Sequence, residues 1–186
     1  SRAGDCDTWL DMRSQVLFGA VMGRVGGMTR RMGALAEWLA GEVGGMGRAE
    51  AARAGRLSKA DLVTGMVGEF ATRPGVMGSI YAARKGESET VSRALAEQYL
   101  PAGPDSPLPE TLCGALVSIA DKADTMAGCF GLGLVPTGAA DPYALRRCPI
   151  GIARILEEKK LRLAVYARPK KAPALSRARL WKLDPS

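Results

Sequence analysis

The 186-residue chain contains no histidine, and its aromatic residues make up only 5% of the composition. Dinuclear phosphohydrolase sites normally combine neutral imidazoles with carboxylates, so the absence of histidine excludes the usual form of such a site. The four cysteines are scattered without a Cys-x-x-Cys pair, which favours reduced structural thiols over zinc ligands or disulfides. We therefore expect neither a catalytic residue nor a metal site in this chain.

The sequence also lacks long apolar runs. No stretch approaches the ~20 residues that a membrane span needs, and no charged-then-apolar leader is present. A composition of 47% hydrophobic and 24% charged residues is typical of a globular protein. We expect a cytoplasmic protein without membrane contact and, because the chain starts at Ser1 rather than methionine, a piece of a longer one.

The net charge of +7 is unevenly distributed along the chain. Residues 1–160 hold 19 basic and 18 acidic side chains, whereas residues 161–186 hold seven basic and one acidic. This division predicts one domain over residues 1–160 and a basic tail over residues 161–186. The tail could meet phosphates, although short basic ends are often merely solvated.

Helical periodicity predominates, and no strand is readable, so the sequence predicts an all-α fold. One apolar stripe runs from Leu17 to Leu39, with a break expected near Gly23–Gly27. Further boundaries are predicted from caps and prolines: a capping box at Ser58–Asp61 opening a helix to Phe70, an N-cap at Ser88, a linker over Pro101–Pro109, and a start at Asp141-Pro142 with a kink at Pro149.

A long helix is predicted from residue 112 to residue 130. Its apolar positions recur at steps of four and three: Leu112, Leu116, Ile119, Ala123, Met126 and Phe130. Asp121 and Asp124 fall on a second face, which is mostly apolar or small. Because an unpaired buried carboxylate costs several kcal/mol, we expect cations opposite them, with Arg146, Arg147 and Lys59 as candidates.

The arginines near the chain's last predicted helix have two readings. Arg147, Gly151 and Arg154 share one face, over which a phosphate backbone could approach. Pairing of Arg146 or Arg147 with the two aspartates is equally compatible with the sequence. The glycine-rich stretch Gly128–Gly138 lacks the Gly-Lys-Ser/Thr ending of a phosphate-binding loop, so a tight interhelical loop is the better interpretation.

Several motifs in order resemble one family. They include Val16-Leu-Phe-Gly-Ala-Val-Met-Gly23, Leu57-Ser-Lys-Ala-Asp-Leu-Val-Thr64, Ala120-Asp-Lys122 with Asp124-Thr125, Pro136-Thr-Gly138, and Asp141-Pro142 with Ala144-Leu-Arg-Arg147. Together they resemble the central helical region of the β subunit of the bacterial two-subunit glycyl-tRNA synthetase, from about Phe18 to Leu156. Gln98 takes the place where the family pattern Glu-His-Tyr carries a histidine.

The resemblance implies an all-α, HD-domain-like helical bundle, here without a metal site. It also implies the glycyl-tRNA synthetase α subunit and tRNA(Gly) as partners, and no DNA. ATP and Mg are used by the α subunit, so no cofactor is expected in this segment. The alternatives are an HD-type phosphohydrolase or nucleotide-binding protein, and a helical protein-interaction module.

Within this reading, the charged residues divide into two predicted groups. The candidate RNA-binding residues are Arg146, Arg147, Arg154, Lys59 and Lys122. The candidate structural acid network is Asp61, Asp121, Asp124 and Asp141.

Overall fold

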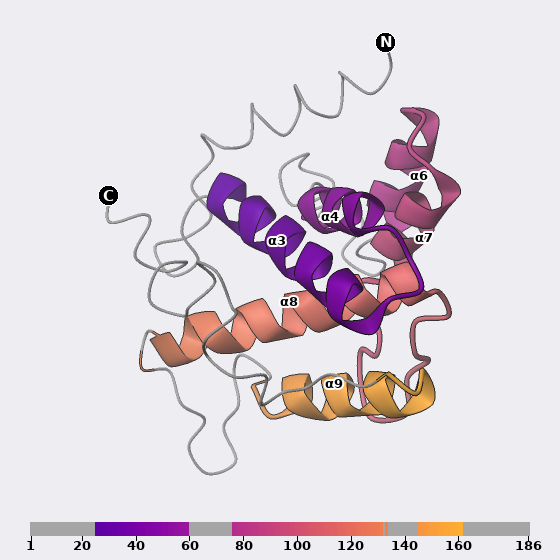
Figure 1. Cartoon of the computed structure of the whole chain (residues 1–186). Helices are drawn as coiled ribbons and strands as arrows, with labels where there is room; N and C mark the ends of the chain where they lie inside the picture. Colours follow the sequence, from indigo (N-terminus) through magenta and orange to yellow (C-terminus); the bar gives the residue numbers. More distant parts are fainter. Residues whose placement is uncertain (1–24, 60–75, 132, 134–144, 162–186) are drawn as a thin grey trace.

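The computed structural model describes residues 25–59, 76–131, 133 and 145–161 (Figure 1). These residues form six α-helices and no strand, which confirms the predicted all-α class. The helices are α3 (Val25–Val43), α4 (Arg48–Leu57), α6 (Val76–Arg84), α7 (Glu89–Glu97), α8 (Leu112–Gly131) and α9 (Arg147–Glu158). The HD-like arrangement and the domain boundary at residue 160 stay predictions.

Helix α8 is the centre of the fold. Helices α3, α4, α7 and α9 all pack against it, and Figure 1 shows α8 running between α3 and α9. Every residue from Cys113 to Ala120 is buried, because neighbours cover this part of the helix on all sides. At the N-terminal end of α8, the predicted apolar stripe therefore included too few of the buried positions. At the C-terminal end, the prediction that Phe130 faces the core was wrong, because this side chain is 51% exposed.

Helices α3 and α4 form an antiparallel pair. The chain reverses through Gly44 and Gly45, whose φ angles of 69° and 82° lie in the left-handed region that glycine adopts without strain. The two helices then approach closely, because a side chain at Gly55 would overlap the Met32 carbonyl. Met32 itself is fully buried, so this crossing belongs to the core.

Helix α7 begins as its sequence predicts. Ser88 is in an extended conformation, and its hydroxyl accepts a hydrogen bond from the Val91 amide at 3.2 Å, which confirms the N-cap. The turn before it is fastened to α4, because Arg53 donates to both carboxylate oxygens of Glu87, at 2.7 and 3.3 Å. These contacts fix the turn between α6 and α7 to α4.

The N-terminus of α8 is capped from another helix. The Glu97 carboxylate, at the end of α7, accepts hydrogen bonds from the amides of Glu110 and Thr111 and from the Thr111 hydroxyl. An anion at a helix N-terminus satisfies free amides and complements the helix dipole. Gly114 leaves the space that this carboxylate occupies.

Two predicted boundaries need correction. Ser58 is not an N-cap: it is in the α conformation at the end of α4, and its hydroxyl donates to the Gly55 carbonyl at 2.7 Å. Helix α4 itself was not predicted, because its alanine- and arginine-rich sequence has a weak apolar stripe. Pro149 lies in the first turn of α9, where a missing amide is tolerated, so it does not kink a continuing helix.

Other predictions lie outside the described residues. These are the helix from Asp61 to Phe70, the stripe before Val25 and the helix start at Asp141-Pro142.

The close crossing of α3 and α4 leads to a stability prediction. We expect Gly55→Ala to lower the free energy of unfolding by about 2 kcal/mol, because the added methyl meets backbone that cannot move aside. Gly131→Ala is the matched control, since open space surrounds that position. Urea denaturation of both variants measures the difference in their free energies of unfolding. Equal midpoints would contradict the close crossing of α3 and α4.

Candidate functional site

A buried ion pair joins α3 to α8. The Arg31 Nε atom lies 2.9 Å from Asp124 Oδ1, and the two side chains are only 9% and 5% exposed. The residues are 93 positions apart in the chain, so the contact closes a long loop. A charged pair with this burial ties the two helices at a defined register.

A second pair lies on the same helix at Asp121. The Lys59 Nζ atom lies 2.6 Å from Asp121 Oδ1 and 3.5 Å from the Gln98 amide oxygen. It also lies 4.5 Å from the centre of the Tyr99 ring, where a cation is attracted to the π face. Lys59 is 5% exposed, so its ammonium group is held inside the protein by partners from α7 and α8.

Burial dominates the electrostatics of Asp124. Desolvation raises the pKa of its carboxyl, and the hydrogen bond and charge of Arg31 oppose that effect only in part. A carboxyl whose pKa is raised by folding contributes stability that is present below the unfolded pKa and lost as pH rises through the folded value. The ionised pair therefore fixes geometry more than it adds net stability.

The sequence identified one of the two cations. Lys59 was among the three candidates, and it pairs with Asp121. Arg31 was not considered, although it lies within the apolar stripe of α3, three residues after Met28 and four before Leu35. An arginine inside such a stripe was the available signal. Asp61 and Asp141, the other predicted acids, lie outside the described residues.

Lys122 points into the protein. It is 8% exposed, and its Nζ atom donates to the Ser118 hydroxyl at 2.9 Å and to the Leu100 carbonyl at 3.2 Å. Burial lowers the pKa of this ammonium group, and Lys59 adds to that effect while Asp121 opposes it. A side chain at Gly151 would lie 2.8 Å from the Lys122 Cε atom. Gly151 is thus covered by Lys122, and the predicted approach of a phosphate backbone over this glycine was wrong.

The arginines of α9 have different surroundings. Arg154 is half-buried and donates to the carbonyls of Gly103 and Ser106, at 3.2 and 3.4 Å, so it fastens the linker to α9. Arg146 and Arg147 are exposed at the N-terminal end of the helix. Of the predicted RNA-binding residues, these two reach the surface most fully.

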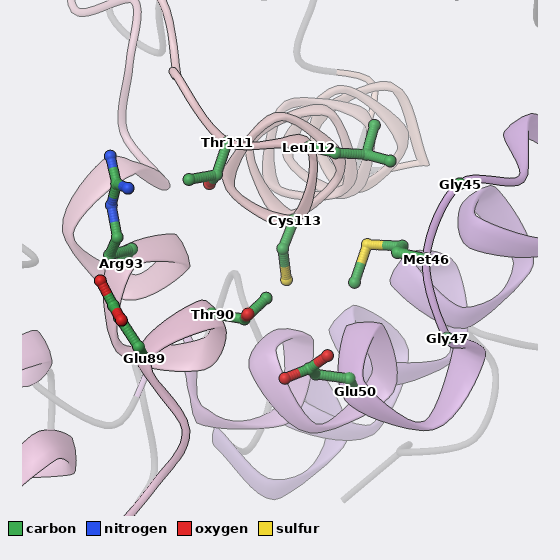
Figure 2. Close-up of a pocket in the computed structure, with 10 residues that line it drawn as sticks. All are labelled: Gly45, Met46, Gly47, Glu50, Glu89, Thr90, Arg93, Thr111, Leu112 and Cys113. Carbon is green, nitrogen blue, oxygen red and sulfur yellow. The ribbon is translucent and has the colours of Figure 1, made fainter.

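A surface pocket that the sequence did not predict lies beside α8 (Figure 2). It has a volume of about 450 Å³. Its lining comes from the turn after α3 and from the first turns of α4, α7 and α8: Gly45, Met46, Gly47, Glu50, Glu89, Thr90, Arg93, Thr111, Leu112 and Cys113. These residues meet only when four helices assemble, so local periodicity could not reveal them.

The thiol in this pocket is unreactive. Burial raises the pKa of Cys113 to about 12, and the negative charges of Glu50 and Glu97 contribute. Since the thiolate is the nucleophile, a thiol of this kind is inert at neutral pH. Cys129 and Cys148 are also buried, and neither forms a disulfide.

Two further findings concern the described part of the chain alone. It contains no group of three or more histidine, cysteine, aspartate or glutamate side chains placed to hold a metal ion. Among its helices, none combines the length and the apolar character required to cross a bilayer.

Comparison with known proteins decides the family. The sequence profile of the family described as glycyl-tRNA synthetase beta subunit matches residues 2–179. The chain belongs to the glycyl-tRNA synthetase β-subunit family. This confirms the family that the ordered motifs predicted.

Relatives in the β-subunit family are closely similar over almost the whole chain. The glycine–tRNA ligase β subunit of Nitratidesulfovibrio vulgaris is 61% identical over 183 residues, which are 98% of this chain and 26% of the relative. That of Oleidesulfovibrio alaskensis is 58% identical over 183 residues, with the same coverage of 98% and 26%. That of Pseudomonas syringae pv. tomato is 51% identical over 157 residues, 84% of this chain and 23% of the relative. The chain thus spans about a quarter of the length of these β subunits.

The buried ion pair between α3 and α8 can be tested by a double-mutant cycle. We expect Asp124→Leu alone to lower the free energy of unfolding by about 3–5 kcal/mol, because the buried Arg31 guanidinium loses the carboxylate that lies 2.9 Å from its Nε atom. Combining it with Arg31→Met should recover most of that loss. Urea denaturation gives the free energy of unfolding of the parent, the two single variants and the double variant. Additive losses in the double variant would show that the two side chains do not depend on each other.

The buried lysine predicts a pH effect of defined sign. Folding lowers the pKa of Lys122 below its ordinary value of 10.5, so between the two values the unfolded chain binds the extra proton. The free energy of unfolding should then rise with pH in that window, by at most about 1.4 kcal/mol per pH unit. Lys122→Met should remove this rise, whereas the exposed Lys160→Met should keep it. Urea titrations at several alkaline pH values test this, and parallel profiles for parent and Lys122→Met would contradict it.

Proposed function

We propose that this chain is a helical scaffold of a glycine–tRNA ligase β subunit, which supports tRNA(Gly) binding and assembly with the α subunit. In this proposal, ATP-dependent glycylation takes place in the α subunit, which uses ATP and Mg, and the complex is cytoplasmic. The family match over residues 2–179 supports the assignment to the subunit. The roles in RNA binding and assembly rest on the surface described next.

The charge arrangement of α9 carries the RNA part of the proposal. Arg146 and Arg147 lie at its N-terminal end, and Glu157 and Glu158 lie at its C-terminal end. This order is the reverse of the one that complements a helix dipole, so these charges do not serve the helix's own stability. Two exposed guanidinium groups beside helix N-terminal amides suit a phosphate backbone.

The predicted lysines are not part of this surface. The ammonium groups of Lys59 and Lys122 are buried and bound to partners inside the protein. Arg154 is half-buried and holds the linker, so it supports α9 and is less exposed than Arg146 and Arg147. We therefore restrict the proposed phosphate contact to Arg146 and Arg147.

Exposed apolar side chains support the assembly part of the proposal. Phe130 at the end of α8 is 51% exposed, and Ile150 on α9 is 57% exposed. In this proposal, a protein partner covers these two side chains. A helical protein-interaction module is thus compatible with the same features. A phosphohydrolase has less support, because Asp121 and Asp124 are already engaged with Lys59 and Arg31.

The RNA contact can be tested by tRNA binding. We expect the double variant Arg146→Ala/Arg147→Ala to weaken tRNA(Gly) binding by about 1–3 kcal/mol, and to reduce the slope of log affinity against log salt by about 2. Fluorescence anisotropy at matched salt measures both quantities. The matched control is Arg84→Ala, an exposed arginine on α6, which should bind as the parent does.

Two further measurements complete this test. A variant lacking residues 168–186 separates the contribution of the basic tail. Urea denaturation checks that the double variant is folded. If the folded double variant binds tRNA as tightly as the parent at every salt concentration, the proposed contact at α9 is wrong.

A further inference from the structure

The surface pocket beside α8 is separate from the buried ion pairs and from the proposed RNA contact on α9. Its volume of about 450 Å³ falls at the low end of the range of ~300–1,000 Å³ that is usual for small-ligand sites. A group the size of one amino-acid side chain fits inside such a space. The chemistry of the lining then decides which kind of group.

The charges around the pocket favour a cation. Glu50 and Glu89 are among its lining residues, and Arg93 is the basic one. Arg93 is itself paired, because its guanidinium lies 3.0 Å from Glu110 and 3.9 Å from Glu97. Burial is the main cause of the raised pKa of the Cys113 thiol, and the negative charges of Glu50 and Glu97 add to it.

The interior combines one carboxylate with less polar groups. Figure 2 shows the Glu50 carboxylate, the Cys113 thiol, the Met46 thioether and the Thr90 side chain directed toward the same hollow. The Ser88 hydroxyl donates to Glu50 Oε1 at 2.8 Å and so holds the carboxylate in position. Sulfur and methyl groups around a fixed carboxylate match a methylene stem that ends in a positive charge.

The rim of the pocket leaves room for a second backbone. Gly47 has open space where a side chain would lie. Glycines at a rim allow another chain to approach closely. This feature favours a cation carried on a polypeptide over a free small amine.

We propose that the pocket binds the arginine or lysine side chain of a partner protein segment. The methylene stem lies against Met46 and Leu112, and the cationic head group meets Glu50, with Glu89 at the rim. Arginine is the better fit, because its guanidinium forms paired hydrogen bonds with a carboxylate and because arginine is common at the centres of protein interfaces. The two carboxylates in the lining repel the phosphates of RNA, so this site is independent of the proposed tRNA contact.

The test uses short probes and the chain itself. The probes are the peptide acetyl-Gly-Arg-Gly-amide, the same peptide with neutral citrulline in place of arginine, and agmatine as a free cation. Binding is followed by the NMR shift of the Met46 methyl group. We expect a saturable shift with the arginine peptide and binding about tenfold or more weaker with citrulline, as the loss of a charge-assisted pair implies.

Variants locate the binding within the pocket. Glu50→Gln and Glu89→Gln should each weaken binding of the arginine peptide, whereas Glu158→Gln on α9 should leave its binding unchanged. If Glu50→Gln is unfolded, the exposed Glu89→Gln still gives the answer. Equal binding of the citrulline peptide would overturn the ionic recognition, and agmatine binding at least as tightly as the peptide would overturn the polypeptide source. The absence of a saturable Met46 shift with either cation would overturn the site itself.

Discussion

The ion pair between Arg31 and Asp124 is the contact on which the packing around α8 depends. Helix α8 is packed against α3, α4, α7 and α9, so a polar group on its buried part must find its partner inside the protein. Arg31 provides that partner from α3, and Lys59 provides a second one for Asp121 from the end of α4. Both contacts join segments far apart in the chain. The register of α3 and α4 on α8 is therefore set by charge as well as by shape.

These interior contacts also explain why small residues are frequent along the crossings. Gly55 allows α4 to reach the backbone of α3, and Gly114 makes space for the Glu97 carboxylate at the start of α8. Gly151 does the same for the stem of Lys122 between α8 and α9. At each place, glycine lets a backbone or a charged side chain lie where a methyl group would clash. The glycine-rich composition thus serves close packing in these helices.

The sequence predicted the all-α class, the family, the helix from residue 112 onward and the Ser88 cap, because each depends on local periodicity or an ordered motif. It also identified Lys59 as a cation for the acids of α8. It missed Arg31 because a helical stripe does not show which charge is covered by a distant helix. It missed α4, whose apolar face is weak. It also placed Phe130 on the core-facing stripe, whereas this side chain at the end of α8 is 51% exposed.

The pocket and α9 show that surface charge in this fold is divided by element. The pocket draws two carboxylates from the first turns of α4 and α7, where negative charge complements the helix dipole. Helix α9 carries the opposite sign at the same end, where the dipole opposes it. Acids at helix N-termini complement the helix dipole, whereas arginines there do not. Opposite charges at the same end of two helices give the two surfaces different electrostatic character: basic at the start of α9 and acidic at the pocket.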